Sequence, residues 1–278
     1  MIAIVLCFGA ILLREATSPS GSGYWPAVAA APGGGLYVAD EDRSELRLVL
    51  DGAPDRIIGS LPHGLYRGLA ADGQTFILAT QGGLFVSADG GGTWKLKNFR
   101  RFTAVALHGG LALAGAWNDS LWRSQDRGLN WSQVNVPAGD TEFESLAITD
   151  SADLAATLLG ILVSTDGGAN WVPATGVGDR VTALDGFEAG DWMGNVYTSR
   201  DGRAWEPSAH LPGGVWSLAG PLAGTTAGVY RNGLPTGGLG SREITRVISS
   251  PPRYYATVAR GPIYASDLGG SWHASRQG

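Results

Sequence analysis

The sequence predicts an all-β protein, a seven-bladed β-propeller built from four-stranded antiparallel blades. Three observations support this prediction. An eight-residue pattern, first seen as SADGGGTW at 87–94, returns until the C-terminal end of the chain. From Trp25 onward the chain divides into units of about 36 residues, each made of short apolar segments separated by turns, as in propeller blades. Glycine is abundant, at 43 residues, and no segment has a sustained helical period of apolar residues.

The repeated pattern, called the box below, has the consensus Ser-x-Asp-x-Gly-x-Thr/Asn-Trp. Its copies are SADGGGTW (87–94), SQDRGLNW (124–131), STDGGANW (164–171), the shorter SRDGRAW (199–205) and ASDLGGSW (265–272). Glycine supplies positive φ in such a turn and the aspartate accepts hydrogen bonds from backbone N–H groups. We therefore predict that the aspartates hold turns and are not catalytic, and that the tryptophans bury their rings between units. These residues are Asp89, Asp126, Asp166, Asp201 and Asp267, with Trp94, Trp131, Trp171, Trp205 and Trp272.

The spacing of the boxes gives the number of units. Their tryptophans stand at 94, 131, 171 and 205, and the last, at 272, follows after two intervals, so one box has been lost. The lost box lies at VYRNGLPTGG (229–238), where Asn-Gly still marks a hairpin. The first unit has SELRLVLDGAPDR (44–56) in place of a box. Counting these two units gives seven blades.

Each unit begins with two apolar strands. The first strands are predicted at 25–31, 65–71, 102–108, 143–149, 180–186, 214–220 and 246–252. The second strands are predicted at 36–40, 75–80, 111–117, 154–160, 191–194, 223–228 and 254–259. A third strand leads into the box, as at 83–89, 120–126, 161–166 and 262–267, and a fourth starts at the tryptophan, as at 94–99, 131–136, 205–210 and 272–277.

The N-terminal 24 residues are expected to be an export or anchor segment followed by a linker, with the propeller domain at 25–278. The apolar run at 2–13 is too short to span a bilayer as a helix and suits an export signal or the inner part of a longer anchor. A buried first strand is the alternative. We expect the protein to be extracytoplasmic, and membrane-associated or secreted. The only cysteine is Cys7, so the propeller has no disulfide.

Both chain ends coincide with blade boundaries. The propeller can therefore close by direct packing of the seventh blade on the first, or by a strand added from 14–24. The sequence leaves both alternatives open.

The mouth of the central channel is where we expect binding residues, because loops carried on a rigid scaffold concentrate function. The candidate residues come from the starts of the first strands and the loops beside them: Tyr66, Arg67, Arg100, Arg101, Asp119, Glu142, Glu144, Asp179, Arg180, Trp216 and Arg246. The alternative interpretation is a set of solvated charges at loop ends.

Several kinds of site are not supported by the sequence. His63, His108, His210 and His273 fall in separate units without metal-ligand spacing, so no metal site and no cofactor are expected. The net charge of −5 argues against nucleic-acid binding. The sequence offers no catalytic residues, because no motif fixes the carboxylate pair that glycosidases generally need.

The box resembles the Asp-box, or bacterial neuraminidase repeat, of sialidase-like propellers. Residues 25–278 are most similar in repeat pattern to the photosystem II assembly and stability factor family. That resemblance implies a non-catalytic scaffold that binds a protein partner in a membrane-protein complex, with an arginine patch whose counterparts are Arg67, Arg100, Arg101, Arg180 and Arg246. The arginine of the sialidase Phe/Tyr-Arg-Ile-Pro motif is absent from 25–31. A glycan-binding or glycoside-hydrolase propeller remains the alternative.

Overall fold

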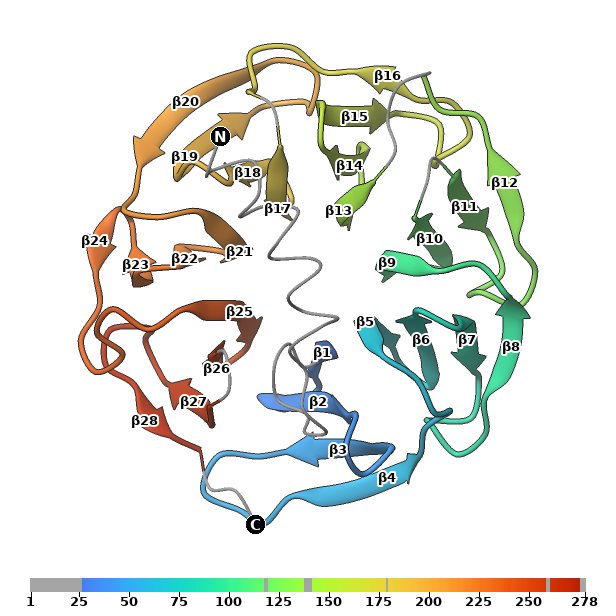
Figure 1. Ribbon diagram of the computed structural model, residues 1–278, viewed down its shortest axis with the longest axis horizontal. Helices are drawn as coiled ribbons and strands as arrows, with labels where there is room; N and C mark the ends of the chain where they lie inside the picture. The colour runs from blue at the N-terminus through green and yellow to red at the C-terminus, as the bar shows by residue number, and fades with distance from the viewer. Residues whose placement is uncertain (1–26, 118–119, 138–141, 179, 259–260, 276–278) are drawn as a thin grey trace, which may run out of the picture.

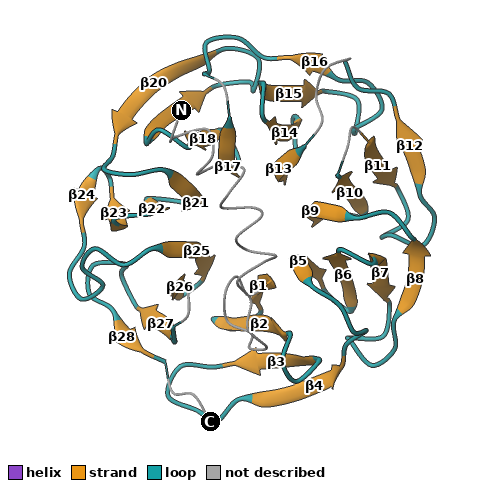
Figure 2. Ribbon diagram, in the orientation of Figure 1, coloured by secondary structure: helices purple, strands orange, loops and turns teal. Residues whose placement is uncertain are grey.

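The protein is a seven-bladed β-propeller, as predicted, with four antiparallel strands in every blade (Figure 1). The computed structural model describes residues 27–117, 120–137, 142–178, 180–258 and 261–275. Within these ranges the chain forms strands and loops without a helix (Figure 2). None of these residues belongs to a helix long and apolar enough to cross a membrane. The expected export or anchor segment at 1–24 lies outside the described residues.

Each blade is formed by four strands that follow one another in the chain. Blade 1 contains β1 (Ala27–Ala31), β2 (Gly35–Asp40), β3 (Glu45–Val49) and β4 (Arg56–Ser60), and blade 2 contains β5 (Tyr66–Asp72), β6 (Thr75–Thr80), β7 (Gly83–Ser87) and β8 (Lys95–Asn98). Blade 3 contains β9 (Phe102–His108), β10 (Leu111–Ala116), β11 (Ser120–Ser124) and β12 (Ser132–Val134). Blade 4 contains β13 (Phe143–Ile148), β14 (Asp153–Thr157), β15 (Gly160–Ser164) and β16 (Val172–Pro173). Blade 5 contains β17 (Val181–Asp185), β18 (Glu188–Asp191), β19 (Asn195–Ser199) and β20 (Trp205–His210). Blade 6 contains β21 (Val215–Ala219), β22 (Leu222–Thr225), β23 (Gly228–Arg231) and β24 (Leu234–Pro235). Blade 7 contains β25 (Ile244–Ser250), β26 (Arg253–Val258), β27 (Ile263–Ser266) and β28 (His273–Ala274).

The propeller has two distinct ends. The first strand of each blade lies nearest the centre and the fourth forms the outer rim (Figure 1). Because four strands alternate in direction within a blade, all seven first strands run the same way. The turns between first and second strands and between third and fourth strands therefore share one end, called the box end below. The turns between second and third strands and the links between blades share the other, called the mouth end.

The box turn of blade 2 is held by hydrogen bonds around Asp89. Ser87 donates its hydroxyl to Asp89 Oδ1 at 2.8 Å, and Thr93 donates its backbone N–H at 2.9 Å and its hydroxyl at 2.6 Å. These donors, the Thr93 hydroxyl first, lower the pKa of Asp89 to about 2. Asn130 plays the part of Thr93 in blade 3, where its backbone N–H is the main cause of the lowered pKa of Asp126. The turn is thus closed by a carboxylate that stays ionised.

The box tryptophans pack between neighbouring blades, as predicted. In the box turns of blades 2 to 5 the indole N–H donates to the carbonyl of the box glycine, for example from Trp205 to Gly202 at 2.8 Å. The Trp205 side chain joins a core cluster that combines Leu154 and Val163 of blade 4 with Val181 of blade 5. Each such ring therefore joins its own blade to the preceding one.

The two departures from the box pattern have different structures. At the lost box of blade 6, Asn232 and Gly233 take φ values of 49° and 81° and join β23 to β24 in a tight hairpin, as the Asn-Gly pair predicts. In the box of blade 7, Asp267 forms an ion pair with Arg253 at 3.6 Å. The Trp272 indole there donates to the Thr236 hydroxyl at 3.0 Å. The blade 7 turn thus keeps the tryptophan of the pattern but uses its aspartate outside the turn.

Glycines allow the blades to approach closely near the centre. A Cβ atom on Gly115 would lie 2.3 Å from Phe143 Cβ in the next blade, and one on Gly190 would lie 2.4 Å from Val215 Cγ1. Real Cβ atoms do not approach this closely, so any larger residue would push the blades apart.

The propeller closes by direct packing of blade 7 on blade 1. Ser250 donates its hydroxyl to the carbonyl oxygens of Ala31 at 2.9 Å and Gly35 at 2.7 Å, and Tyr255 donates to the Gly34 carbonyl at 2.7 Å. Tyr255 also packs in a core cluster with residues of blade 1. Of the two predicted modes of closure, this is the one formed by the described residues; the segment 14–24 lies outside them.

The seam between blades 7 and 1 also contains an ionic contact. The Asp51 carboxylate contacts the Arg253 guanidinium and lies 3.0 Å from His273 Nε2. We expect Asp51→Asn to lower the free energy of unfolding by about 1 kcal/mol, since the Asp51 side chain is largely shielded from solvent. Urea unfolding at low salt measures this loss. The control is Asp150→Asn, whose fully exposed side chain lies 3.5 Å from His108 and which we expect to be neutral. Equal stability of the two variants would contradict the prediction.

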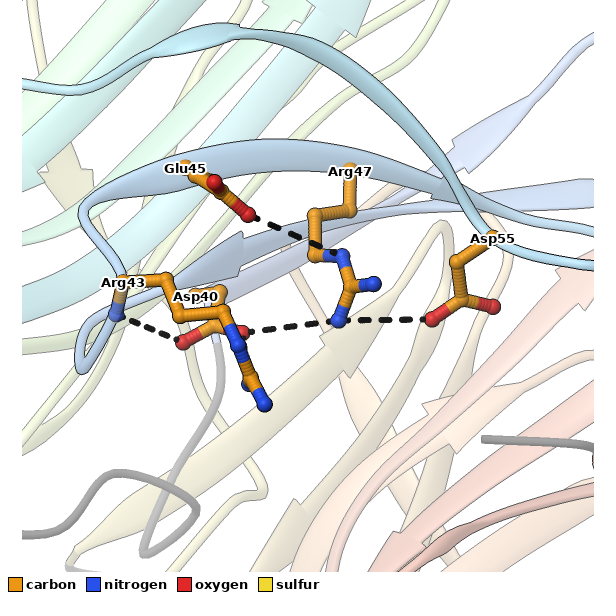
Figure 3. Close-up of polar contacts among 5 residues, drawn as sticks. All are labelled: Asp40, Arg43, Glu45, Arg47 and Asp55. Atoms are coloured by element: carbon orange, nitrogen blue, oxygen red, sulfur yellow. Dashed lines mark hydrogen bonds and ion pairs between the residues drawn. The ribbon is translucent and has the colours of Figure 1, made fainter. Parts of the chain in front are cut away.

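Blade 1, which lacks the box, has a group of ion pairs centred on Arg47 (Figure 3). Its guanidinium lies 3.7 Å from Asp40 Oδ2 and 3.5 Å from Asp55 Oδ2, and Glu45 lies 4.0 Å away. Arg43 donates to the Asp40 carboxylate at 2.8 Å. Arg47 thereby links the end of β2 to the segment before β4.

Candidate functional site

The predicted site residues that the structure describes all belong to the mouth end. Tyr66, Arg67, Glu144, Trp216 and Arg246 lie in the first halves of the innermost strands. Arg100, Arg101, Glu142 and Arg180 lie in the links that lead into these strands. Asp119 and Asp179 fall outside the described residues. Six blades thus place a candidate at the same end of the channel, but the candidates differ in what they contact.

A β-bulge recurs at the start of the innermost strand in blades 2 to 7. In each case one extra residue stands between the first and second register partners. The extra residues are Arg67, Thr103, Glu144, Thr182, Trp216 and Thr245. Bulges re-aim side chains at the rims of closed sheets and beside functional sites. The three predicted residues Arg67, Glu144 and Trp216 are therefore structurally equivalent.

The bulge residues alternate in kind around the propeller. In blades 3 and 5 they are Thr103 and Thr182, whose hydroxyls donate to the carbonyls of Phe143, at 2.7 Å, and Val215 in the next blade. In blade 7, Thr245 bonds to Thr257 within its own blade. The threonine hydroxyls are thus used in hydrogen bonds to neighbouring strands. The larger bulge side chains are those of Arg67, Glu144 and Trp216, in blades 2, 4 and 6.

Arg246 lies next to the bulge of blade 7 and is half-buried. Its guanidinium donates to the Trp216 carbonyl at 3.2 Å. Burial lowers the pKa of Arg246, and the carboxylate of Glu144, from blade 4, acts in the opposite direction. The residues from blades 4, 6 and 7 are thus linked across the channel by charge and hydrogen bonding.

Two arginine–tryptophan stacks occupy equivalent positions in blades 3 and 5. The Arg101 guanidinium lies 4.8 Å from the Trp117 ring centroid, and that of Arg180 lies 5.4 Å from the Trp192 ring centroid. In both blades the backbone N–H of the tryptophan donates to the backbone carbonyl of the arginine, at 2.9 Å in blade 3 and 3.2 Å in blade 5. Arg180 has a φ of 55°, which is uncommon for a non-glycine residue. The same backbone bond and the same stack therefore occur on both sides of blade 4.

Large apolar side chains are exposed beside these stacks. Phe99, in the link before blade 3, is 84% exposed; Leu159 and Met193, in the mouth-end turns of blades 4 and 5, are 61% and 56% exposed. Isolated exposed apolar residues are common, but groups of them mark interaction surfaces. We call the surface formed by the two stacks and these three side chains the Arg–Trp face.

Some predicted residues have other surroundings. Tyr66 is buried, and its hydroxyl donates to the Pro62 carbonyl at 2.8 Å, so its ring belongs to the core beneath the mouth. Burial raises the pKa of Glu41, although the hydrogen bond from the Tyr66 N–H and the positive charge of Arg67 act in the opposite direction. Arg100 is exposed and lies 6.0 Å from the Trp122 ring centroid.

Trp117 and Trp192 belong to the Arg–Trp face but are not among the site residues predicted from the sequence. They fall inside the predicted second strands 111–117 and 191–194, whereas β10 ends at Ala116 and β18 at Asp191. Both tryptophans therefore begin the turns at the mouth end. The available signal was the tryptophan at the end of an apolar strand in these two units only, since Gln81, Leu158 and Thr226 follow the second strands elsewhere.

The described residues contain no group of three His, Cys, Asp or Glu side chains that could hold a metal ion. The mouth end instead combines cations, carboxylates and aromatic rings. Such an arrangement is suited to recognition of another molecule by stacking, hydrogen bonding and charge.

Comparisons with known proteins agree on the fold. The chain is similar to the computationally designed Ika8 protein, with a TM-score of 0.65, 16% identity, and coverage of 92% of this chain and 89% of that chain. It is also similar to YCF48 bound to a D1 peptide, with a TM-score of 0.55, 19% identity, and coverage of 76% and 81%. A third similar structure is the extracellular domain of the putative one-component system BT4673 from B. thetaiotaomicron, with a TM-score of 0.61, 13% identity, and coverage of 88% and 39%.

At these identities the likeness shows the fold alone. No family model matches the chain, and no curated protein matches it in sequence. The class defined by fold and comparison is therefore the β-propeller, within which several functions occur.

Proposed function

We propose that this protein is a non-catalytic propeller scaffold that binds a partner protein through the Arg–Trp face. The observation that carries the proposal is the repetition of the same arginine–tryptophan stack in blades 3 and 5, beside exposed Phe99, Leu159 and Met193. Arginine and tryptophan are enriched among residues that contribute most to binding energy at protein interfaces. The rigid blades fix the two stacks relative to each other, which limits the entropy lost on binding.

The chemistry of the face suggests the kind of partner. Arg100, Arg101 and Arg180 favour a segment that carries carboxylates, and the exposed apolar side chains favour one that also carries aliphatic or aromatic residues. Glu142 and Glu144 bring negative charge to the same mouth end, so the partner segment is expected to have mixed charge. The peptide-bound state of the similar propeller YCF48 supports a protein or peptide partner.

The proposed setting is extracytoplasmic, in or beside a membrane-protein complex. The apolar run at 2–13 supports export or anchoring, and the similar domain of BT4673 is an extracellular one. The resemblance in repeat pattern to Asp-box propellers of the photosystem II assembly and stability factor family supports a role as scaffold or assembly factor.

Charge reversal at both stacks tests the binding surface. We expect Arg101→Glu/Arg180→Glu to weaken partner binding by about 10-fold or more, because it removes both stacks and reverses the local charge. The measurement is quantitative co-purification of tagged full-length protein from detergent-solubilised membranes, with partner stoichiometry. The matched control is Arg127→Glu/Arg200→Glu, which makes the same charge change on exposed box turns of the same two blades.

The outcomes distinguish the site from the function. Equal loss of partner in both variants would show a general charge effect and not a site. Full retention by the stack variant, with normal thermal unfolding, would place the partner elsewhere on the propeller. Recovery of the wild-type propeller alone, in the soluble fraction, would overturn the scaffold proposal, and glycan-array and glycoside-hydrolase assays would then test the alternative.

A further inference from the structure

A cavity of about 320 Å³ opens at the box end, away from the Arg–Trp face. Its wall is formed by the first turns of blades 1, 2 and 7, with Ala30, Pro32, Tyr37, Asp72 and Pro251 among the lining residues. The volume is at the lower end of the range found for small-molecule pockets.

Small side chains in the innermost strands create this space. Ala30 of β1 and Ala71 of β5 both line the cavity. The equivalent register positions in blades 3 and 4 hold Leu107 and Ile148. The run of alanines in β1 therefore leaves one sector of the channel unfilled at the box end.

The wall contains few polar side chains. The ring of Tyr37 is fixed by an edge-on contact with Phe76, at 4.8 Å between centroids. The Ser250 hydroxyl is engaged by the carbonyls of Ala31 and Gly35, which close the propeller. Among the lining residues, the one acidic or basic side chain is that of Asp72.

The surroundings of the cavity are negatively charged. Asp72, Asp150 and Asp185 lie in or beside the first turns of blades 2, 4 and 5. The seven turns that join first to second strands contain no lysine or arginine; they are 32–34, 73–74, 109–110, 149–152, 186–187, 220–221 and 251–252. Arg253 directly follows the last of these turns, and the carboxylates of Asp51 and Asp267 pair with it. The turns themselves thus carry negative charge, opposite to that of the arginines at the mouth end, and favour a cation.

We propose that this cavity binds a small organic cation, an ammonium group on a compact apolar body. The Asp72 carboxylate is the counter-ion, while the Tyr37 ring and the alanine and proline side chains contact the apolar body. A free amine and a lysine side chain of a partner protein carry the same chemistry. The cavity lies at the opposite end from the Arg–Trp face, so this inference does not depend on the proposed function.

Ligand-observed NMR titration of the full-length protein tests the proposal. The probes are benzylamine, its neutral analogue benzyl alcohol and its anionic counterpart phenylacetate, together with N-acetyl-lysine methylamide as the model of a lysine side chain. We expect benzylamine to bind about 10-fold more tightly than benzyl alcohol, and phenylacetate to bind most weakly. Tighter binding of the lysine probe than of benzylamine identifies a partner's lysine as the source, and the reverse order identifies a free amine.

Two variants locate the binding. Asp72→Asn keeps the shape of the side chain and is expected to bring the affinity for benzylamine to that for the alcohol. Ala30→Leu fills the cavity and is expected to abolish binding of both. If Ala30→Leu perturbs folding, Asp72→Asn alone decides, because Asp72 lies at the edge of an open turn. Equal affinity for amine and alcohol in the wild type, or an amine preference that survives Asp72→Asn, would overturn the proposal.

Discussion

Replacement of Trp205 by alanine is expected to lower the free energy of unfolding by about 3–5 kcal/mol. The ring is 3% exposed and packs with Leu154 and Val163 of blade 4 and Val181 of blade 5. Its removal leaves a cavity at a blade interface, and the Gly202 carbonyl loses the indole N–H as its partner. Urea unfolding followed by circular dichroism measures the loss.

The control for Trp205→Ala is Trp94→Ala. Trp94 donates the same hydrogen bond in the box of blade 2, to Gly91 at 3.2 Å, but its side chain is only half-buried. We expect a clearly smaller loss for Trp94→Ala, because less apolar area returns to water. Equal losses would mean that the box hydrogen bond, and not burial between blades, determines the contribution of the tryptophan.

Asp153→Asn is expected to stabilise the protein above pH 7 by about 2 kcal/mol. Asp153 starts β14 and is 3% exposed. Burial raises its pKa to about 6, against the attraction of Arg123, while Asp166 adds to the rise. The native state therefore holds a proton on Asp153 more tightly than the unfolded chain does.

The sign of the pH dependence follows from that difference. At a pH below the ordinary value of 3.8 the carboxyl is neutral in both states and carries no ionisation cost. Between pH 3.8 and about 6 the unfolded chain ionises while the native state keeps its proton, so stability falls as the pH rises across this range. Above about pH 6 the native state ionises the buried group as well, and stability stays at the lower level. Asparagine does not ionise, so the advantage of the variant should appear between pH 4 and pH 6 and persist at higher pH.

Urea unfolding at pH 4, 5.5 and 8 measures this effect. Asp126→Asn serves as the control of opposite sign, because hydrogen bonds from Asn130 and Ser124 lower the pKa of Asp126 to about 2. Its ionised form stabilises the fold above pH 3.8, and that stabilisation is lost as the pH falls through about 2. Asp126→Asn should therefore destabilise the protein at pH 8, and a gain there, or no gain for Asp153→Asn, would contradict this account.

Much of the fold was predictable because the box encodes local geometry. Asp89, the glycine that follows and Trp94 specify a turn and the start of the next strand within eight residues, and the recurrence of that unit gives the blade count. The Asn232–Gly233 hairpin was predictable for the same reason, since positive φ at both positions suits these residues. Strand boundaries were less predictable, because Trp117 and Trp192 continue apolar strands in sequence but begin turns in the structure.

The candidate site was predictable in position but not in contacts. The starts of the innermost strands could be assigned to one end of the channel from topology, which located Arg101 and Arg180. Their tryptophan partners come from across a hairpin, and the equivalence of Arg67, Glu144 and Trp216 depends on a bulge that leaves no clear sequence signal. Tyr66 resembled a surface aromatic in sequence, yet the core beneath the mouth buries it.

The order of the strands, the box turns and the number of blades follow from the amino-acid sequence, since they depend on interactions between residues close in the chain. The tertiary structure alone decided how blade 7 closes on blade 1, which side chains meet across the channel and where small residues leave a cavity. Ser250 and Gly35, for example, are more than 200 residues apart and meet at 2.7 Å only because seven blades complete one ring. Such contacts depend on the summed geometry of all the blades, which no single segment encodes.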